Sequence, residues 1–204
     1  MKAIHLALLV SVSAALCPGQ ENSAHKNELA FTLGGLPSLS QGGTPSIDLG
    51  SGLALQVNYG RRLLNGGLVA LYGEVHLLAS PLRSVSTSIS TATRDVATLY
   101  ITPGIRVKLL PSSPISPYFA AGGGYADYEQ STTRIDGAPN QAPRQLGRGA
   151  FDVGAGIDGH LWRFVAVRVE ARDFFTGKPN YNISTITGGQ NNVVVGGGLV
   201  LRWH

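Results

Sequence analysis

The chain has 204 residues, enough for one domain and a targeting segment but too short for two ordinary domains. Charged residues make up 14% of it and hydrophobic residues 43%, and 27 positions are glycine. The formal net charge of +4 is small and scattered along the chain, which argues against a nucleic-acid partner. After residue 20 no apolar run approaches the eighteen or so residues that a membrane helix needs, so the apolar content is spread over shorter segments.

The N-terminus is typical of a secretory signal peptide, with Lys2 in front of an apolar stretch at residues 4–16 and small or turn residues after it. We expect cleavage after Gly19, which divides the chain into a signal peptide at 1–19 and a single domain at 20–204. The only cysteine, Cys17, then leaves with the signal, and the mature protein has no disulfide. Lipidation of Cys17 is the alternative, but the large Leu16 stands where lipoprotein signals have glycine or alanine.

Eight segments alternate apolar with small or polar residues at a period of two, which predicts β-strands. In chain order they cover residues 28–35, 52–61, 68–78, 96–109, 117–128, 150–161, 164–173 and 192–203. The facing of the strand at 117–128 is open, because Phe119 and Tyr125 share one face and Tyr118 and Tyr128 the other.

The connections between these strands alternate in length. Residues 62–67, 110–116 and 162–163 form short turns, whereas residues 36–51, 79–95, 129–149 and 174–191 form long loops. This alternation is typical of transmembrane barrels, in which the short turns and both termini face the periplasm and the long loops face outward. The loops are rich in polar residues, glycine and proline, and we expect them to be mobile.

The chain resembles the eight-stranded outer-membrane barrels of the OmpA transmembrane-domain and OmpX-like kind. Four segments carry the resemblance: residues 100–106, with the sequence YITPGIR, residues 118–125, residues 168–174 and the terminal strand. The resemblance implies an all-β, eight-stranded antiparallel up-and-down transmembrane β-barrel. Such a protein is monomeric, resides in the bacterial outer membrane and contacts its lipid and lipopolysaccharide.

The resemblance also implies an assembly signal in the last strand. The barrel-insertion machinery of the family recognises a glycine, a hydrophobic residue and a terminal aromatic, which Gly198, Leu201 and Trp203 match. His204 follows the aromatic and departs from the family pattern.

Alternation alone leaves open whether the apolar faces point to lipid or, as in soluble lipocalin-like barrels, to the interior. The polar faces here are mostly Gly, Ala, Thr and Asn and lack the abundant Lys and Glu of a water-facing surface, which favours lipid outside. An eight-stranded barrel is just wide enough for side chains to fill it, so each inward charge needs a partner. We therefore expect a charge network that fills the lumen, made of Glu74, His76, Arg106, Lys108, Asp152, Asp158, Arg168, Glu170, Arg172 and Arg202.

The aromatic residues fall near strand ends more often than in strand middles. We expect girdles at the two membrane interfaces, formed by Tyr59, Tyr72, Tyr100, Tyr118, Tyr128, Trp162 and Trp203.

Catalytic and metal-binding signals are weak. Glu74, His76 and Ser80 share an inward face, but no acyl chain enters a filled barrel, and the histidines lack ligand spacing with other metal-binding residues. We expect no catalytic residue, metal or cofactor. The predicted function is a structural or surface-interaction role exerted through the long loops; a small low-conductance pore is the alternative, and a lipid-modifying enzyme is less favoured.

Overall fold

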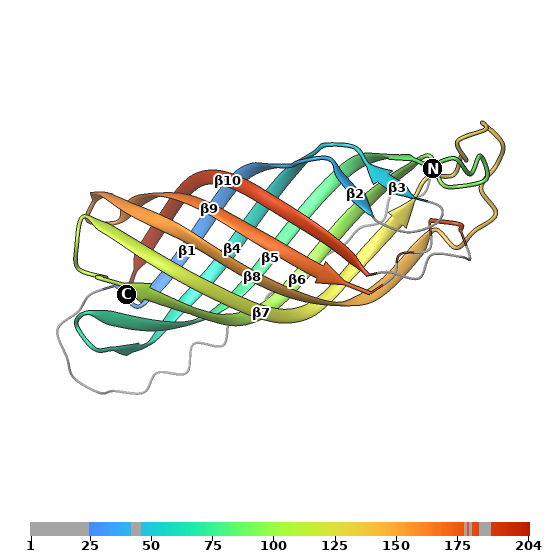
Figure 1. Ribbon diagram of the computed structural model, residues 1–204. Helices are drawn as coiled ribbons and strands as arrows, with labels where there is room; N and C mark the ends of the chain where they lie inside the picture. Colours follow the sequence, from blue (N-terminus) through green and yellow to red (C-terminus); the bar gives the residue numbers. More distant parts are fainter. Residues whose placement is uncertain (1–24, 42–45, 178, 180, 184–188) are drawn as a thin grey trace.

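The computed structural model describes residues 25–41, 46–177, 179, 181–183 and 189–204 (Figure 1). The predicted signal peptide at 1–19, with Cys17, lies outside the described residues. In the described part of the chain no helix is long and apolar enough to cross a membrane.

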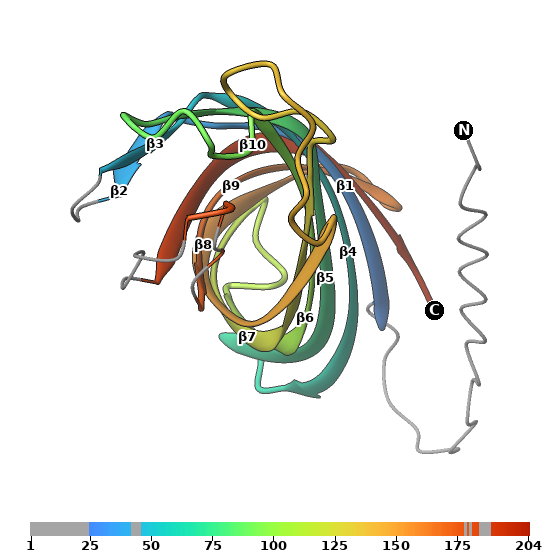
Figure 2. The same ribbon diagram turned by 90° about the vertical axis from the view of Figure 1, so that its right-hand side faces the viewer.

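Eight long strands form a closed ring, which confirms the predicted fold class. They are β1 (Asn27–Leu36), β4 (Gly52–Asn65), β5 (Val69–Ser86), β6 (Asp95–Leu109), β7 (Ile115–Gln130), β8 (Gln145–Trp162), β9 (Val165–Thr176) and β10 (Gln190–Trp203). Each pairs antiparallel with its neighbours in this order. The last strand, β10, pairs with β1 and so removes the free edge of the sheet. Figure 2 shows the ring towards its long-loop end.

Two further strands lie in the predicted loop at 36–51, which the sequence pattern did not reveal. They are β2 (Leu39–Gln41) and β3 (Ile47–Leu49), of three residues each. The strand β3 pairs with the far end of β5, where Asp48 is opposite Ser86. The first long loop therefore folds as a small antiparallel extension of the wall beside the ring (Figure 2).

Several strands are longer than predicted, and most of the added residues lie at the long-loop end. The strands β5 and β8 have 18 residues each, whereas a tilted strand needs only about 9–11 residues to cross a bilayer. Residues 79–86 and 145–149, which we expected in loops, therefore continue the wall of the ring. The long loops therefore begin beyond these strand extensions and not directly at the predicted strand ends.

The apolar faces of the strands point outward and the polar faces inward, as the composition favoured. Leu33 is 59% exposed and Val169 62% exposed on the outside, whereas Glu74 and Thr102 are buried inside. The undecided strand follows the same rule, since Phe119 and Tyr125 are exposed outside. A lipocalin-like arrangement is excluded, because that would bury the large apolar side chains.

The predicted aromatic girdles need correction. Four of the tyrosines, Tyr72, Tyr100, Tyr118 and Tyr128, are buried in the lumen. They occupy the inward parity of their strands, so they fill the interior and do not contact lipid. Trp162 and Trp203 are exposed outside, near the short-turn end.

Two seams on opposite sides of the ring bring backbones together where only glycine fits. A Cβ at Gly198 would lie 1.8 Å from the carbonyl oxygen of Phe31, at the β10–β1 seam. A Cβ at Gly104 would lie 2.2 Å from the carbonyl oxygen of Ala121, at the β6–β7 seam. Glycines in strands mark such close approaches and bends, and these positions permit the tight curvature of a small barrel.

Candidate functional site in the barrel interior

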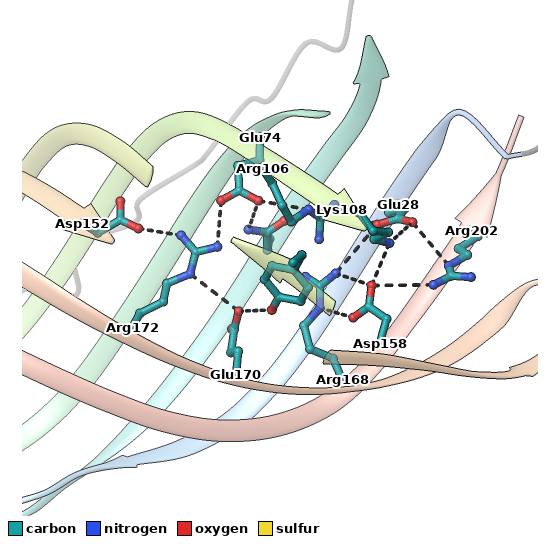
Figure 3. A network of polar contacts seen from close by, with 12 residues as sticks. Glu28, Glu74, Arg106, Lys108, Asp152, Asp158, Arg168, Glu170, Arg172 and Arg202 are labelled. Atoms are coloured by element: carbon teal, nitrogen blue, oxygen red, sulfur yellow. Dashed lines mark hydrogen bonds and ion pairs between the residues drawn. The ribbon is translucent and has the colours of Figure 1, made fainter. Parts of the chain in front are cut away.

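A network of ten charged side chains lies inside the ring, towards the short turns (Figure 3). It comes from six strands and balances five carboxylates against five bases: Glu28, Glu74, Asp152, Asp158 and Glu170 with Arg106, Lys108, Arg168, Arg172 and Arg202. All ten are buried. Balance matters here, because an uncompensated charge in a closed interior is far more costly than a paired one.

The part of the network nearest the short turns is centred on Glu28 and Asp158. Lys108 Nζ lies 2.7 Å from a carboxylate oxygen of each. Arg168 donates from Nε and Nη2 to the two carboxylate oxygens of Asp158, at 2.8 and 3.0 Å. Arg202 contacts both acids at 3.4 and 3.6 Å, so β10 is tied to β1 and β8 through charge as well as through the sheet.

The second part of the network is centred on Arg172. Its Nη2 donates to Glu74 at 2.7 Å and its Nη1 to Asp152 at 2.6 Å, which joins β9 to β5 and β8. Glu170 lies 3.6 Å from Arg172 Nε and accepts a hydrogen bond of 2.7 Å from the Tyr118 hydroxyl.

Arg106 connects the two parts. Its Nη2 lies 2.7 Å from Glu28 and its Nε 3.5 Å from Glu74. The guanidinium carbon is 4.9 Å from the Tyr72 ring centre and 5.3 Å from that of Tyr118. Such cation–π contacts gain strength away from water, so the buried tyrosines are part of the network.

The structure brings together nine of the ten predicted lumen residues, and the tenth, His76, stands apart. His76 is buried in the same interior, but neither ring nitrogen has a hydrogen-bond partner, and its ring lies against Phe174 at 5.6 Å. The sequence prediction also missed Glu28, which contacts four bases. The alternation along the strand could have identified it, because Glu28 lies on the same strand face as Ala30 and Thr32, and the structure buries both of these residues in the lumen.

A layer of uncharged polar side chains covers the network on the side of the long loops. Asn58, His76 and Thr102 are direct neighbours across β4, β5 and β6. Six buried atoms of this layer have no hydrogen-bond partner among the described residues: Gln56 Oε1 and Nε2, Asn58 Oδ1, both His76 nitrogens and Thr102 Oγ1. Proteins commonly satisfy such groups with internal water.

An apolar layer then closes the lumen towards the long loops. Its buried side chains include Ala54, Leu78, Tyr100, Ala126, Phe174 and Val194. The Tyr100 hydroxyl accepts a hydrogen bond of 2.7 Å from Asn192 and lies 3.1 Å from the Tyr128 hydroxyl. The inside of the barrel is thus a packed core at this level.

Arg83, a residue of the barrel wall, also helps to close the lumen at the long-loop end. It was expected in a loop but lies in β5 and is buried. Its guanidinium donates to the carbonyl oxygens of Gly50 at 2.9 Å and Pro37 at 3.2 Å and to Asn192 Oδ1 at 2.5 Å. These bonds fasten the first long loop to β5 and β10.

Three of the long loops are hydrogen-bonded to one another, and together we call residues 87–94, 131–144 and 181–183 the loop cap. Thr93 N donates to Tyr181 O at 3.0 Å, and Ile135 N donates to Ala92 O at 3.0 Å. The amide of Asn182 donates to Thr91 O at 2.8 Å. These bonds link the described parts of three loops that we expected to be mobile.

Side chains reinforce the cap. Tyr181 is buried in it, where its hydroxyl donates to Gln190 Oε1 and burial raises the pKa of the phenol. On the surface, Arg134 donates to the carboxylate of Asp136, and this hydrogen bond lowers the pKa of Asp136.

The residues of the predicted assembly signal lie along the closing strand. Leu201 pairs with Leu29 and Trp203 with Asn27, at the short-turn end of the β10–β1 seam. Both side chains are partly exposed on the outside, while Gly198 sits where the two backbones approach most closely. Within the described residues, no group of His, Cys, Asp or Glu could hold a metal ion.

Solved structures share this fold. The crystal structure of Neisserial surface protein A matches with a TM-score of 0.55 at 12% identity, covering 90% of this chain and 100% of that one. Outer membrane protein OprG from Pseudomonas aeruginosa matches with a TM-score of 0.53 at 11% identity, covering 88% and 97%. The outer membrane enzyme PagL matches with a TM-score of 0.46 at 15% identity, covering 85% and 98%.

The similarities to Neisserial surface protein A and OprG establish the fold as that of the eight-stranded bacterial outer-membrane barrels, a broader group than the OmpA and OmpX-like kind named from the sequence. No family model and no curated protein matches the chain in sequence.

Proposed function

We propose that the protein is an integral barrel of the bacterial outer membrane, closed inside, with a structural or surface-interaction role exerted through its loop cap. In this placement the exposed apolar band contacts lipid, the loop cap faces the medium and lipopolysaccharide, and the short turns face the periplasm. The protein acts as a monomer, is inserted by the barrel-insertion machinery and needs no cofactor.

The observation that carries the proposal is the sealed interior. The charge network fills the lumen towards the short turns, the apolar layer around Leu78, Tyr100 and Phe174 fills it towards the long loops, and the uncharged polar layer lies between them. An ion that crosses would have to break several buried ion pairs and then enter an apolar core. The surface that we propose for contacts with the medium is then the loop cap.

A small low-conductance pore is the second candidate. The unpartnered polar layer around His76 favours it, because hydrated groups in mid-lumen are what an ion path requires. A catalytic role has less support. Neither Ser80 Oγ nor His76 has a hydrogen-bond partner, so the nucleophile–base contact of an acyl-transfer site is missing among these residues.

Planar-bilayer recordings of the refolded mature chain separate the candidates. We expect no steady current, either for the whole chain or after shortening of loop residues 131–144, because both interior layers remain. A heat-modifiable band in gels shows in each case that the barrel has folded. Discrete channel openings from the folded whole chain would favour the pore.

A further inference from the structure

Exposed bases gather on one side of the short-turn end of the barrel. Lys26 precedes β1, Arg61 lies in β4, and Arg163 lies in the turn between β8 and β9; all three are exposed. The sheet makes them neighbours: Asn27 pairs with both Arg61 and Trp203, and Arg202 N donates to Phe164 O at 2.9 Å. We call Lys26, Arg61 and Arg163 the basic rim.

Among the described residues, these bases have no ion pair with a side-chain carboxylate, in contrast to Arg94, Arg134 and Arg144 at the opposite end. In the loop cap and the adjoining strand ends, Arg94 contacts Asp95 at 3.5 Å, Arg134 contacts Asp136, and Arg144 contacts Glu129. At the short-turn end, the described residues 25–27, 60–69, 109–116, 159–165 and 203–204 contain no Asp or Glu. The side chains of Glu28 and Asp158, in the strands beside this region, face inward and are committed to the network.

Large aromatic side chains stand next to the basic rim on the outer surface. Trp162 is 72% exposed, and Phe164 and Trp203 are also exposed. The Arg163 guanidinium carbon lies 5.2 Å from the Phe164 ring centre. Exposed Trp and Phe beside Lys and Arg are typical of protein surfaces at the level of lipid headgroups.

The pKa of His25 reflects its burial and the charges around it. Burial is the main reason why its pKa is below the ordinary value, and nearby positive charge, including that of Arg163 and Arg202, lowers it further. This direction agrees with the cluster of exposed bases around the β10–β1 seam.

We propose that the basic rim binds the phosphate of anionic phospholipids, of the phosphatidylglycerol type, in the leaflet that faces the short turns. The inference rests on the membrane placement proposed above. The bases of the rim, which have no side-chain ion pair among the described residues, supply the charge complement, and Trp162 and Trp203 hold them at headgroup depth beside the acyl chains. A partner in the aqueous phase would gain nothing from these outward aromatics.

The test uses the refolded mature chain in phosphatidylcholine bilayers that contain spin-labelled lipid. The wild-type protein immobilises labelled phosphatidylglycerol in preference to labelled phosphatidylcholine, and roughly 1 M salt abolishes the preference. The variant K26Q/R61Q/R163Q loses the preference, by about fivefold for each base removed. The matched control R94Q/R134Q/R144Q, which removes three bases from the loop end, keeps it. In addition, the pKa of His25 measured by NMR rises when phosphatidylglycerol replaces phosphatidylcholine.

Equal preference in the wild type and in the rim variant overturns the proposal. So does a rim variant that keeps its lipid preference but no longer sediments with purified cell-wall sacculi, because the bases would then serve a wall polymer. Both outcomes leave the membrane placement intact as long as the proteins show a heat-modifiable band and immobilise lipid at all. A folded protein that immobilises neither lipid shows instead that the membrane placement is wrong.

Discussion

At the scale of single residues, Glu28 determines the charge balance near the short turns. Four bases lie within 3.7 Å of its carboxylate. We predict that Glu28→Gln lowers the free energy of unfolding by about 3 kcal/mol, because it leaves buried positive charge uncompensated. Urea unfolding of the protein refolded in liposomes measures the loss.

The double variant E28Q/K108M serves as the internal control. The remaining bases keep an acid partner: Arg106 keeps Glu74, and Arg168 and Arg202 keep Asp158. We therefore expect the double variant to be more stable than E28Q alone, whereas Glu129→Gln, which breaks an exposed pair, costs less than about 1 kcal/mol. Strictly additive losses from E28Q and K108M would contradict a coupled network.

The sequence predicts which side chains point inward, because strand parity decides this, but it does not predict which of them make contact. Parity placed Arg106, Asp158 and Arg172 in one lumen, while their pairing depends on the tilt and stagger of strands far apart in the chain. His76 has the same parity as Glu74 and yet makes no ion pair. The buried tyrosines were misassigned because position near a strand end was given more weight than parity.

At the scale of the element, each strand has an apolar outer face, which contacts lipid in the membrane placement that we propose. Val169 is 62% exposed and lies near the middle of β9. We predict that Val169→Arg costs about 2–4 kcal/mol, the range found for bases near the bilayer midplane on lipid faces. Ser88→Arg, in the loop cap, is the control and has little effect. Comparable losses for both, measured by unfolding from liposomes, would refute the outward assignment.

The closing strand is the second element with a testable role. Trp203 pairs with Asn27, and its ring lies 6.3 Å from that of Tyr59, so the end of β10 completes the seam. We predict that removal of Trp203 and His204 leaves a protease-sensitive species in the periplasm, whereas removal of His204 alone is tolerated. Cell fractionation and heat-modifiability gels distinguish these results. Outer-membrane recovery of the shorter form as a folded band would show that Trp203 is dispensable for assembly.

Strand positions followed from the sequence better than strand lengths. The period-two pattern locates β1 and β9 closely because an apolar outer face and a polar lumen face impose strict alternation. The alternation weakens towards the long loops, and residues 79–86 and 145–149 were expected in loops for this reason. The short strands β2 and β3 were missed because three residues are too few to show a period, and their pairing with β5 is not local.

At the scale of the whole molecule, the interior is layered along the barrel axis. From the short turns towards the long loops, the charge network connects six strands and is followed by the uncharged polar layer. The apolar layer comes next, and the loop cap lies at the end. The apolar layer merges with the loops, since Tyr181 belongs to the same buried cluster as Tyr100 and Tyr128. The loops are thus supported from inside the barrel.

This continuity predicts that the loops protect one another from proteolysis. Tyr181 stands perpendicular to Tyr128 at 6.5 Å, and its backbone oxygen accepts the hydrogen bond from Thr93 N. We predict that Tyr181→Ala increases the rate at which proteinase K cleaves residues 87–94 and 131–144 several-fold, although neither segment is altered in sequence. Arg144→Gln, which removes only the exposed pair with Glu129, leaves the rate unchanged. If Tyr181→Ala sped cleavage only near position 181, the loops would act independently, and the surface role proposed here would rest on separate loops and not on one cap.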